Sequence, residues 1–447
     1  MDILELIFQA GIVGCGGAGF PTHIKLNAKV NNFIINGVEC EPLLRTDRYL
    51  MIHKADELVQ ATEMVAKKLN AKDIYIALKE NYHEEIESIQ AAIKKFKSKI
   101  RIYKMENYYP AGDEQMVVCD VLGKTIPPGG IPLDVSAVVS NVETMIGVYN
   151  ASKGINFTHK YLTINGAVKK PVIAYVPIGT SFGDCLKLAG GSTLDRYKII
   201  DGGPLMGDVL DFDSYKNQRV TKIASGILAI PEESYLSTRS DISLSHMLNR
   251  AKSSCIQCTY CTQMCPRHLI GHPLEPHRIM RKVAYSNSLS EILDDHITKQ
   301  ALTCCECGIC ELFACPMQIQ PLRVNQLLKE EYAKHNIRYT KEEKPYNERE
   351  EHEYRKIPSQ RMAAKVDVID YYDNDVTTLV KYEPKKVSIS LKQHIGSPAK
   401  SVVAIGEQVK CGQIIGVCKK DELGSNIHAS IDGKVIEVGE EIVIEKQ

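Results

Sequence analysis

Two similar runs of cysteines are the residues of this sequence best suited to chemistry. Nine of the 15 cysteines lie between Cys255 and Cys315. The run from Cys255 has the spacing Cys-x2-Cys-x2-Cys-x3-Cys-Pro, and the run from Cys304 has Cys-x2-Cys-x2-Cys-x4-Cys-Pro. Three cysteines spaced in this way let one loop supply three corners of a [4Fe–4S] cluster, and the cysteine before proline usually ligates the other cluster. The spacing therefore predicts two [4Fe–4S] clusters.

Each cluster is expected to take three cysteines from its own run and the cysteine before proline from the other run. The ligands expected for the first cluster are Cys255, Cys258, Cys261 and Cys315. Those expected for the second are Cys304, Cys307, Cys310 and Cys265. Cys305 is an alternative to its neighbour Cys304. A pair of structural zinc sites is the alternative interpretation of CxxC pairs, but it leaves the third spaced cysteine and the repeated Cys-Pro unexplained.

A glycine-rich segment near the N-terminus is the second candidate site. Gly14-Cys15-Gly16-Gly17-Ala18-Gly19 fits the G-x-G-x-x-G pattern, and Glu39 follows twenty residues after Gly19, as in dinucleotide-binding folds. The thirteen residues before the loop, interrupted by Glu5 and Gln9, fit the required strand poorly. The robust expectation is a backbone free to approach a phosphate, with Lys25 nearby to neutralise it.

Acidic and amide residues beside glycines form three further motifs. They are Asn36-Gly37-Val38-Glu39-Cys40-Glu41-Pro42, Tyr109-Pro110-Ala111-Gly112-Asp113-Glu114 and Asn141-Val142-Glu143-Thr144. Such residues suit hydrogen bonding to hydroxyls and ring nitrogens. Taken singly, each also fits an ordinary turn or helix cap.

The elements that must position these motifs alternate between strands and helices over residues 1–157. Short apolar or β-branched runs predict strands at 32–36, 73–78 and 100–103, and helical periodicity predicts helices at 56–69 and 82–97. This alternation is typical of a parallel α/β layer. We therefore expect a multidomain α/β protein whose first domain is Rossmann-like.

Four further segments follow. Residues 158–235 predict a small α+β domain with a hairpin turn at Asn165-Gly166 and a helix at 182–188. Residues 236–335 predict a helical, ferredoxin-like domain around the cysteines. A charged connector with a helix is expected over 336–380. Residues 381–447 are β-rich and resemble the lipoyl-type barrel-sandwich hybrid, without the lysine that carries lipoyl.

The composition excludes several function classes. Lys+Arg and Asp+Glu are 55 each, so the chain has no excess of positive charge that would indicate binding to nucleic acid or anionic membranes. The N-terminus has no basic segment, and no apolar run reaches the ~18 residues that a membrane-spanning helix needs. The cysteines are clustered rather than spread as in secreted disulfide scaffolds. We expect a cytosolic protein.

Taken together, the motifs resemble a known family. G-x-G-G-A-G-F-P-T-x-x-K, N-x-x-E-x-E-P, Y-P-x-G-[DE]-E and N-V-E-T occur in the order seen in the flavin- and NADH-binding subunit of respiratory complex I and in the Rnf C subunit. A barrel placed last, together with Cys265-Pro266-Arg267-His268, resembles the cobalamin reductases of propanediol-utilisation microcompartments. The resemblance covers nearly the whole chain.

The resemblance implies specific roles. Residues implied to hold the FMN phosphate are Gly14, Gly16, Gly17, Gly19 and Lys25. Residues implied to contact the flavin ring and ribityl chain are Asn36, Glu39, Tyr109, Gly112 and Asn141. Glu41 and Glu114 match acidic positions near the NADH site, and Phe20 remains as an aromatic there. Residues 158–235 are similar to the family's small ligand-binding β-grasp (SLBB-like) domain.

The expected function is therefore electron transfer from NADH through FMN and two clusters to a corrinoid, because a flavin exchanges two electrons with NADH and one with a cluster. The resemblance implies partners among microcompartment proteins and an adenosyltransferase, and a location in the cytoplasm, inside a bacterial microcompartment. Both a monomer and an oligomer fit the sequence. One alternative is an electron-transfer protein similar to Rnf C, or to the related protein serving proline reductase, whose acceptor is another protein. The other is a scaffold with purely structural clusters.

Overall fold

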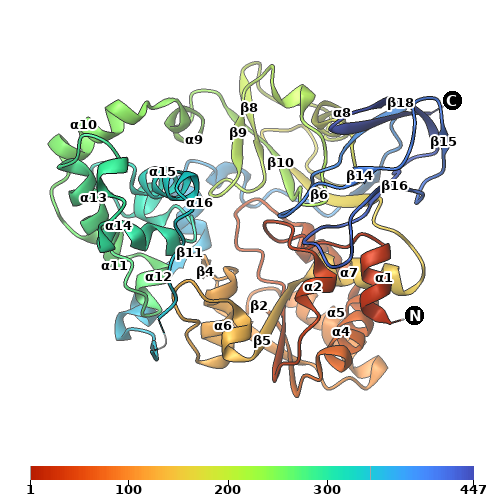
Figure 1. The fold of residues 1–447 in the computed structure, drawn as a ribbon, viewed down its shortest axis with the longest axis horizontal. Helices are drawn as coiled ribbons and strands as arrows, with labels where there is room; N and C mark the ends of the chain where they lie inside the picture. Colours follow the sequence, from red (N-terminus) through yellow and green to blue (C-terminus); the bar gives the residue numbers. More distant parts are fainter. Residues whose placement is uncertain (1, 343, 447) are drawn as a thin grey trace.

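The computed structural model describes residues 2–342 and 344–446. A lower α/β domain, a helical domain, an upper β-sheet domain and a C-terminal barrel surround the middle of the molecule (Figure 1). Within the described ranges, no helix is both long and apolar enough to cross a membrane.

The first domain is built on a parallel sheet in the order β3-β2-β1-β5. Its strands are β1 (Asn32–Asn36), β2 (Asp73–Lys79), β3 (Arg101–Met105) and β5 (Ala137–Asn141). Its helices are α1 (Ile3–Gln9), α2 (Thr22–Lys25), α3 (Thr46–His53), α4 (Ala55–Leu69), α5 (His83–Phe96), α6 (Glu114–Leu122) and α7 (Val142–Ser152). The residues of β1 before Asn36 are all buried, as expected for a strand covered on both faces.

Local signals set the boundaries of this domain accurately. Helices α4 and α5 both end at a left-handed residue, Asn70 and Lys97, which is a common way to terminate a helix. The predicted strand at 32–36 and helices at 56–69 and 82–97 are found within two residues. The glycine loop follows helix α1 rather than a strand, so it is not the strand-to-helix turn of a dinucleotide fingerprint.

The second domain contains a sheet in the order β12-β7-β6-β10-β8-β9. Its strands are β6 (His159–Gly166), β7 (Val172–Pro177), β8 (Tyr197–Asp201), β9 (Asp208–Leu210), β10 (Gly226–Pro231) and β12 (Leu379–Lys381). Helix α8 (Phe182–Leu188) agrees with the predicted helix at 182–188. The outermost strand, β12, comes from the segment predicted as a connector.

The predicted hairpin is present, because β6 pairs antiparallel with β7, but its turn does not lie at Asn165-Gly166. Both residues stay in β6, where they pair with β10, and the chain turns only after them. Asn165 is fully buried, and its amide donates to the Leu43 carbonyl at 2.9 Å. Gly166 has φ +86°, and a Cβ there would lie 2.2 Å from the Ala229 carbonyl oxygen. Close approach of β10, rather than a turn, requires this glycine.

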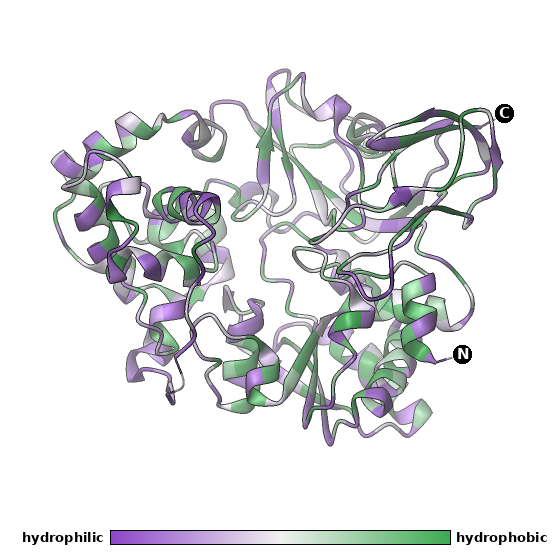
Figure 2. Ribbon diagram, in the orientation of Figure 1, coloured by the Kyte–Doolittle hydropathy of each residue, from purple (hydrophilic) through white to green (hydrophobic). Residues whose placement is uncertain are grey.

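The helical domain surrounds the cysteine runs. Its helices are α9 (Tyr235–Thr238), α10 (Leu244–Ser254), α11 (Tyr260–Gln263), α12 (Pro266–Leu269), α13 (Pro276–Ala284), α14 (His296–Lys299) and α15 (Pro321–Lys334). Its outer helices carry many hydrophilic residues, whereas the helices of the first domain carry more hydrophobic residues (Figure 2). Small domains of this kind commonly depend on metal ligation for stability.

The segment after the helical domain crosses back over the molecule. Strand β11 (Ile357–Pro358) pairs with β4 (Tyr108–Tyr109), and helix α16 (Ser359–Lys365) follows it directly. Met362 and Ala363 of α16 are buried in a core shared with Tyr109. The second half of the predicted connector is thus part of the protein interior.

The C-terminal domain consists of two small sheets, β13-β19-β18-β15 and β14-β16-β17, that enclose one apolar core. Its strands are β13 (Lys386–Ser390), β14 (Lys400–Ser401), β15 (Gln408–Val409), β16 (Ile414–Val417), β17 (Ile427–His428), β18 (Gly433–Val438) and β19 (Glu441–Glu445). This arrangement agrees with the predicted barrel-sandwich hybrid.

Candidate flavin and cluster sites

The glycine loop projects from a closed base to an open tip. Gly14 N donates to the Phe20 carbonyl at 2.9 Å, which closes the base. Gly16 and Gly17 are exposed at the tip, and a Cβ on Gly17 would meet nothing within 4 Å. The backbone N–H of Cys15 donates to Thr144 Oγ1 at 2.9 Å and so anchors the loop on the first turn of α7. An exposed backbone beside a helix N-terminus can bind a phosphate.

Gly19, unlike the glycines at the tip, is required by close packing against other domains. Its φ is +73°, and a Cβ there would lie 2.8 Å from Ile223 and 3.0 Å from His394. The C-terminal barrel therefore packs directly on the end of the loop. The Ile395 N–H also donates to the Ala18 carbonyl at 3.0 Å. The barrel and the β-grasp domain thereby hold the loop in place.

Asp47, which belongs to none of the predicted motifs, connects two predicted flavin contacts. Its backbone N–H donates to Glu39 Oε1 at 2.9 Å, and its Oδ2 accepts from Asn141 Nδ2 at 2.7 Å. Glu39 also accepts from Arg48 N and so caps α3, while Asn141 Oδ1 caps α7. Burial raises the pKa of Glu39 and, together with the charge of Glu39, raises the pKa of Asp47 well above its ordinary value. No spacing rule would single out Asp47.

The remaining predicted residues of this region also interact. Lys25 forms a 2.7 Å ion pair with Glu114 at the start of α6. Asn36 Nδ2 donates to the Gly112 carbonyl at 2.8 Å. A Cβ on Gly112 would lie 3.0 Å from Cys40 Sγ, so glycine is needed for the close contact of these two motifs.

Polar atoms without partners make this region suitable for a flavin mononucleotide. Among the described residues, Oγ1 of Thr22 and Oε1 of Gln115 are buried and have no hydrogen-bond partner. Thr22 follows the loop directly and Gln115 follows Glu114, and burying such atoms unpaired costs free energy. Phe20 is 39% exposed at the loop. Open glycines, unpaired polar atoms and an exposed aromatic ring fit the phosphate, hydroxyl and ring portions of FMN.

Tyr109 and Glu41 lie between the first domain and the second cysteine run. The Tyr109 hydroxyl donates to the Cys307 carbonyl at 2.7 Å and lies 3.3 Å from Glu41 Oε1. Glu41 Oε2 accepts from the Leu205 N–H at 3.0 Å. Burial raises the pKa of the Glu41 carboxyl to about 7, although these hydrogen bonds act in the opposite direction.

A partly buried ion pair joins the same two regions. Arg267, directly after Cys265-Pro266, donates to both oxygens of Asp113 at 2.7 and 2.9 Å. Bidentate pairing of this kind fixes orientation as well as distance. Both residues lie within motifs recognised in the sequence, but the spacing of those motifs predicted no function for either residue.

The first cysteine set lines one small cavity. Cys255, Cys258, Cys261 and Cys315 all line it, together with apolar residues such as Met280 and Ile319, and the Cys261 thiol interacts electrostatically with the other three. Thiols that converge in an apolar pocket without forming disulfides fit an iron–sulfur cluster. The structure thus brings together the four residues predicted to hold the first cluster.

The second set contains five neighbouring thiols. Electrostatic interactions connect Cys265 with Cys304 and Cys305, and connect Cys310 with Cys265 and Cys304. Cys307 interacts with Cys305, Cys265 and Cys310. Cys310 is also within electrostatic range of Cys261 of the first set, so the two sets are adjacent.

The backbone distinguishes Cys304 from Cys305. In the first loop, Gln257 and Thr259 have φ of 53° and 65°, and in the second loop Glu306 and Gly308 have φ of 61° and 78°. Superposing these left-handed positions aligns Cys304 with Cys255, and Cys305 with a residue that is not a cysteine. The register therefore favours Cys304 as the cluster ligand.

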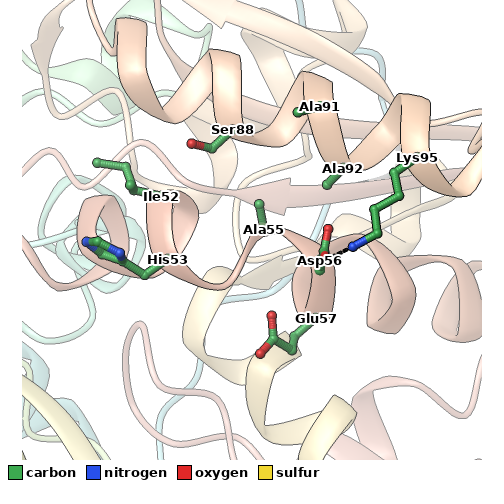
Figure 3. Close-up of a pocket in the computed structure, with 9 residues that line it drawn as sticks. All are labelled: Ile52, His53, Ala55, Asp56, Glu57, Ser88, Ala91, Ala92 and Lys95. Carbon is green, nitrogen blue, oxygen red and sulfur yellow. Dashed lines mark hydrogen bonds and ion pairs between the residues drawn. The ribbon is translucent and has the colours of Figure 1, made fainter.

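A cavity of about 360 Å³ elsewhere in the first domain is unrelated to these sites. It opens between the end of α3, the start of α4 and helix α5, where Asp56 pairs with Lys95 (Figure 3). None of its lining residues belongs to the predicted flavin or cluster sets.

Comparison with protein families assigns each domain. Residues 7–150 match the Nuo51 FMN-binding domain, residues 161–209 the SLBB domain, residues 254–320 the 4Fe-4S dicluster domain and residues 374–447 the RnfC barrel sandwich hybrid domain. The chain therefore contains an FMN-binding domain and a dicluster domain.

Individual relatives cover the chain to different extents. The chain is 38% identical to cobalamin reductase PduS of Citrobacter freundii, over 99% of this chain and 95% of that protein. It is 39% identical to the Salmonella typhimurium protein of the same name, over 99% and 96% of the two chains. The C component of the proton-translocating ferredoxin:NAD(+) oxidoreductase complex of Clostridium ljungdahlii is 36% identical over 60% of this chain and 56% of its own length. With similarity to two PduS proteins along its whole length, the chain belongs to the PduS family of cobalamin reductases.

Proposed function

We propose that this protein is an NADH-dependent reductase of corrinoids. One NADH would supply two electrons and release a proton, and two cob(III)alamin molecules would each take one electron to become cob(II)alamin. The proposal is supported by full-length similarity to proteins named cobalamin reductase. A location in a bacterial microcompartment, with an adenosyltransferase as the recipient of the reduced corrinoid, belongs to the same proposal.

FMN, when bound, supplies the conversion between two-electron and one-electron chemistry. In this proposal the open tip at Gly16 and Gly17 binds its phosphate, and Lys25 neutralises the charge. The partnerless Thr22 hydroxyl and Gln115 amide oxygen would then gain partners. Phe20 covers the nicotinamide.

The contact between Tyr109 and Cys307 carries the proposed electron path. It joins a predicted flavin residue to the second cysteine set by a 2.7 Å hydrogen bond. Arg267 and Asp113 hold the two domains together at the same junction. The first cysteine set is adjacent to the second set, through Cys261 and Cys310. It includes the loop of Ile256 and Tyr260, which are 61% and 50% exposed. We therefore assign the second cluster to the flavin side and the first cluster to the acceptor side.

Anaerobic visible spectroscopy of the FMN-loaded, iron-reconstituted protein tests the function. With NADH and hydroxocobalamin, we expect flavin and cluster absorbance to bleach and the cob(III)alamin spectrum to convert catalytically to that of cob(II)alamin. Bleaching without conversion of cobalamin would contradict the corrinoid acceptor and favour an acceptor protein, as in the Rnf-type alternative. Clusters that NADH does not reduce would contradict the electron path itself.

A further inference from the structure

A groove of about 650 Å³ runs along the helical domain beside the first cysteine set. Tyr260, Met264 and Phe313 contribute apolar and aromatic lining. Arg355 also lines the groove, and helix α16 contributes Arg361, Ala364 and Lys365. This volume lies in the range of small-molecule sites, about 300–1,000 Å³.

The groove shares a wall with the cavity of the first cysteine set. Cys315 and Pro316 line both spaces, and Cys255, Cys258 and Cys261 line the cavity alone. A molecule in the groove would therefore be separated from the cluster site by little more than the Cys315 ligand and its neighbour. This is the position that a terminal electron acceptor requires.

The charges on the groove are all of one sign. Arg355, Arg361 and Lys365 line it, no acidic residue does, and none of the three forms an ion pair within the described part of the chain. The Arg361 guanidinium lies 5.4 Å from the centre of the Phe313 ring. Arg355 donates to Gln263 Oε1 at 3.3 Å. The groove thus combines an apolar and aromatic surface with positive charge available for an anion.

We propose that this groove binds the corrinoid acceptor, an assignment that rests on the function proposed above. A corrinoid with its nucleotide loop offers ring methyl groups for Tyr260 and Phe313 and a phosphodiester for the cations. A cluster held by Cys315 and its partners would supply one electron to a corrinoid in the groove, and that electron would reduce cobalt(III) to cobalt(II). An acceptor protein fits less well, because protein partners typically cover about 800 Å² of comparatively flat surface on each side.

Charge reversal on α16 tests the groove without touching a cluster ligand. Arg361 and Lys365 are exposed, so Arg361→Glu with Lys365→Glu leaves the core intact. We expect hydroxocobalamin to bind about tenfold or more weakly in equilibrium dialysis and its KM to rise by a similar factor. NADH-driven reduction of a viologen dye should be unchanged. The matched control is Lys252→Glu with Arg281→Glu, which makes the same charge change at exposed positions on α10 and α13.

A steric variant provides an independent test. Ala364 is exposed and lines the groove, so Ala364→Trp should fill it and raise the KM for hydroxocobalamin. Gln360→Trp, on the same helix but outside the groove lining, should leave that KM unchanged. Unaltered binding and KM in both groove variants would overturn the groove assignment alone. Wild-type protein that reduces the dye but neither binds nor reduces hydroxocobalamin would overturn the groove together with the corrinoid acceptor.

Discussion

The hydroxyl of Tyr109 donates a 2.7 Å hydrogen bond to the backbone carbonyl of Cys307, a residue 198 positions away in the chain. This bond joins the domain that matches an FMN-binding fold to the loop that supplies the second cysteine set. Because Tyr109 is 1% exposed, water does not compete for the bond. The two redox domains therefore meet through a dry, specific contact.

Tyr109→Phe removes this contact while preserving the ring. We expect the clusters and flavin to be retained and the rate of cluster reduction by NADH to fall by up to about tenfold, since a buried hydrogen bond contributes about 1 kcal/mol. Stopped-flow spectroscopy of the cluster bands measures this rate. Tyr108→Phe is the control, because the Tyr108 hydroxyl donates to Asp120 instead. Equal slowing in both variants would contradict a specific role for Tyr109.

The loop register predicts different consequences for two adjacent cysteines. Cys304→Ser should lose about half of the cluster iron, because an oxygen ligand replaces the thiolate at one corner of the second cluster. Cys305→Ser should keep its iron, because Cys305 occupies the position of Ile256 in the first loop. Iron analysis and electron paramagnetic resonance of the reduced proteins distinguish the outcomes. Iron loss confined to Cys305→Ser would reverse the assignment.

Lys222 ties three domains together from a fully buried position. Its ammonium donates to the carbonyls of Gly11 at 2.8 Å and Asn426 at 2.7 Å. Lys222→Met leaves the Gly11 carbonyl without this hydrogen bond and the Asn426 carbonyl with only the 3.4 Å hydrogen bond from Ser425 Oγ. A buried group left unpaired costs about 1–3 kcal/mol. We expect a lower midpoint of thermal unfolding and faster release of the C-terminal barrel by limited proteolysis. Lys216→Met, at an exposed position of the same domain, should behave like the wild type.

The Glu41 carboxyl should make stability depend on pH. Its pKa is about 7 in the folded protein against 4.5 for an ordinary glutamate. Between these values the folded state binds more protons, so this group's contribution is full below pH 4.5 and is lost as the pH rises through 7. Thermal unfolding of the anaerobic holoprotein between about pH 5 and 8 should show the wild type losing stability relative to Glu41→Gln as the pH rises. An equal dependence of stability on pH in both proteins would contradict the raised pKa of Glu41. Glu437→Gln removes a charge at an exposed position and serves as the control.

Local patterns were enough for much of the fold because they report on burial and backbone preference. The apolar run of β1 and the periodicity of α4 and α5 indicated these elements within two residues, since β1 is buried on both faces and each helix buries one face. The turn predicted at Asn165-Gly166 lies elsewhere, because pairing with the distant strand β10 decides the conformation of these two residues. The connector was predicted from charge along the chain, whereas β11 and α16 pack into a core made by distant segments.

Spacing along the chain was sufficient for the two cysteine runs and the open glycine loop, because one short loop supplies most of each site. Packing in three dimensions was needed for everything that crosses between segments: the Tyr109–Cys307 bond, the Arg267–Asp113 pair, the role of Asp47 and the groove beside Cys315. These contacts join residues tens to hundreds of positions apart. The partners in these contacts depend on how distant segments pack against each other, and such packing produces no periodic pattern in the sequence.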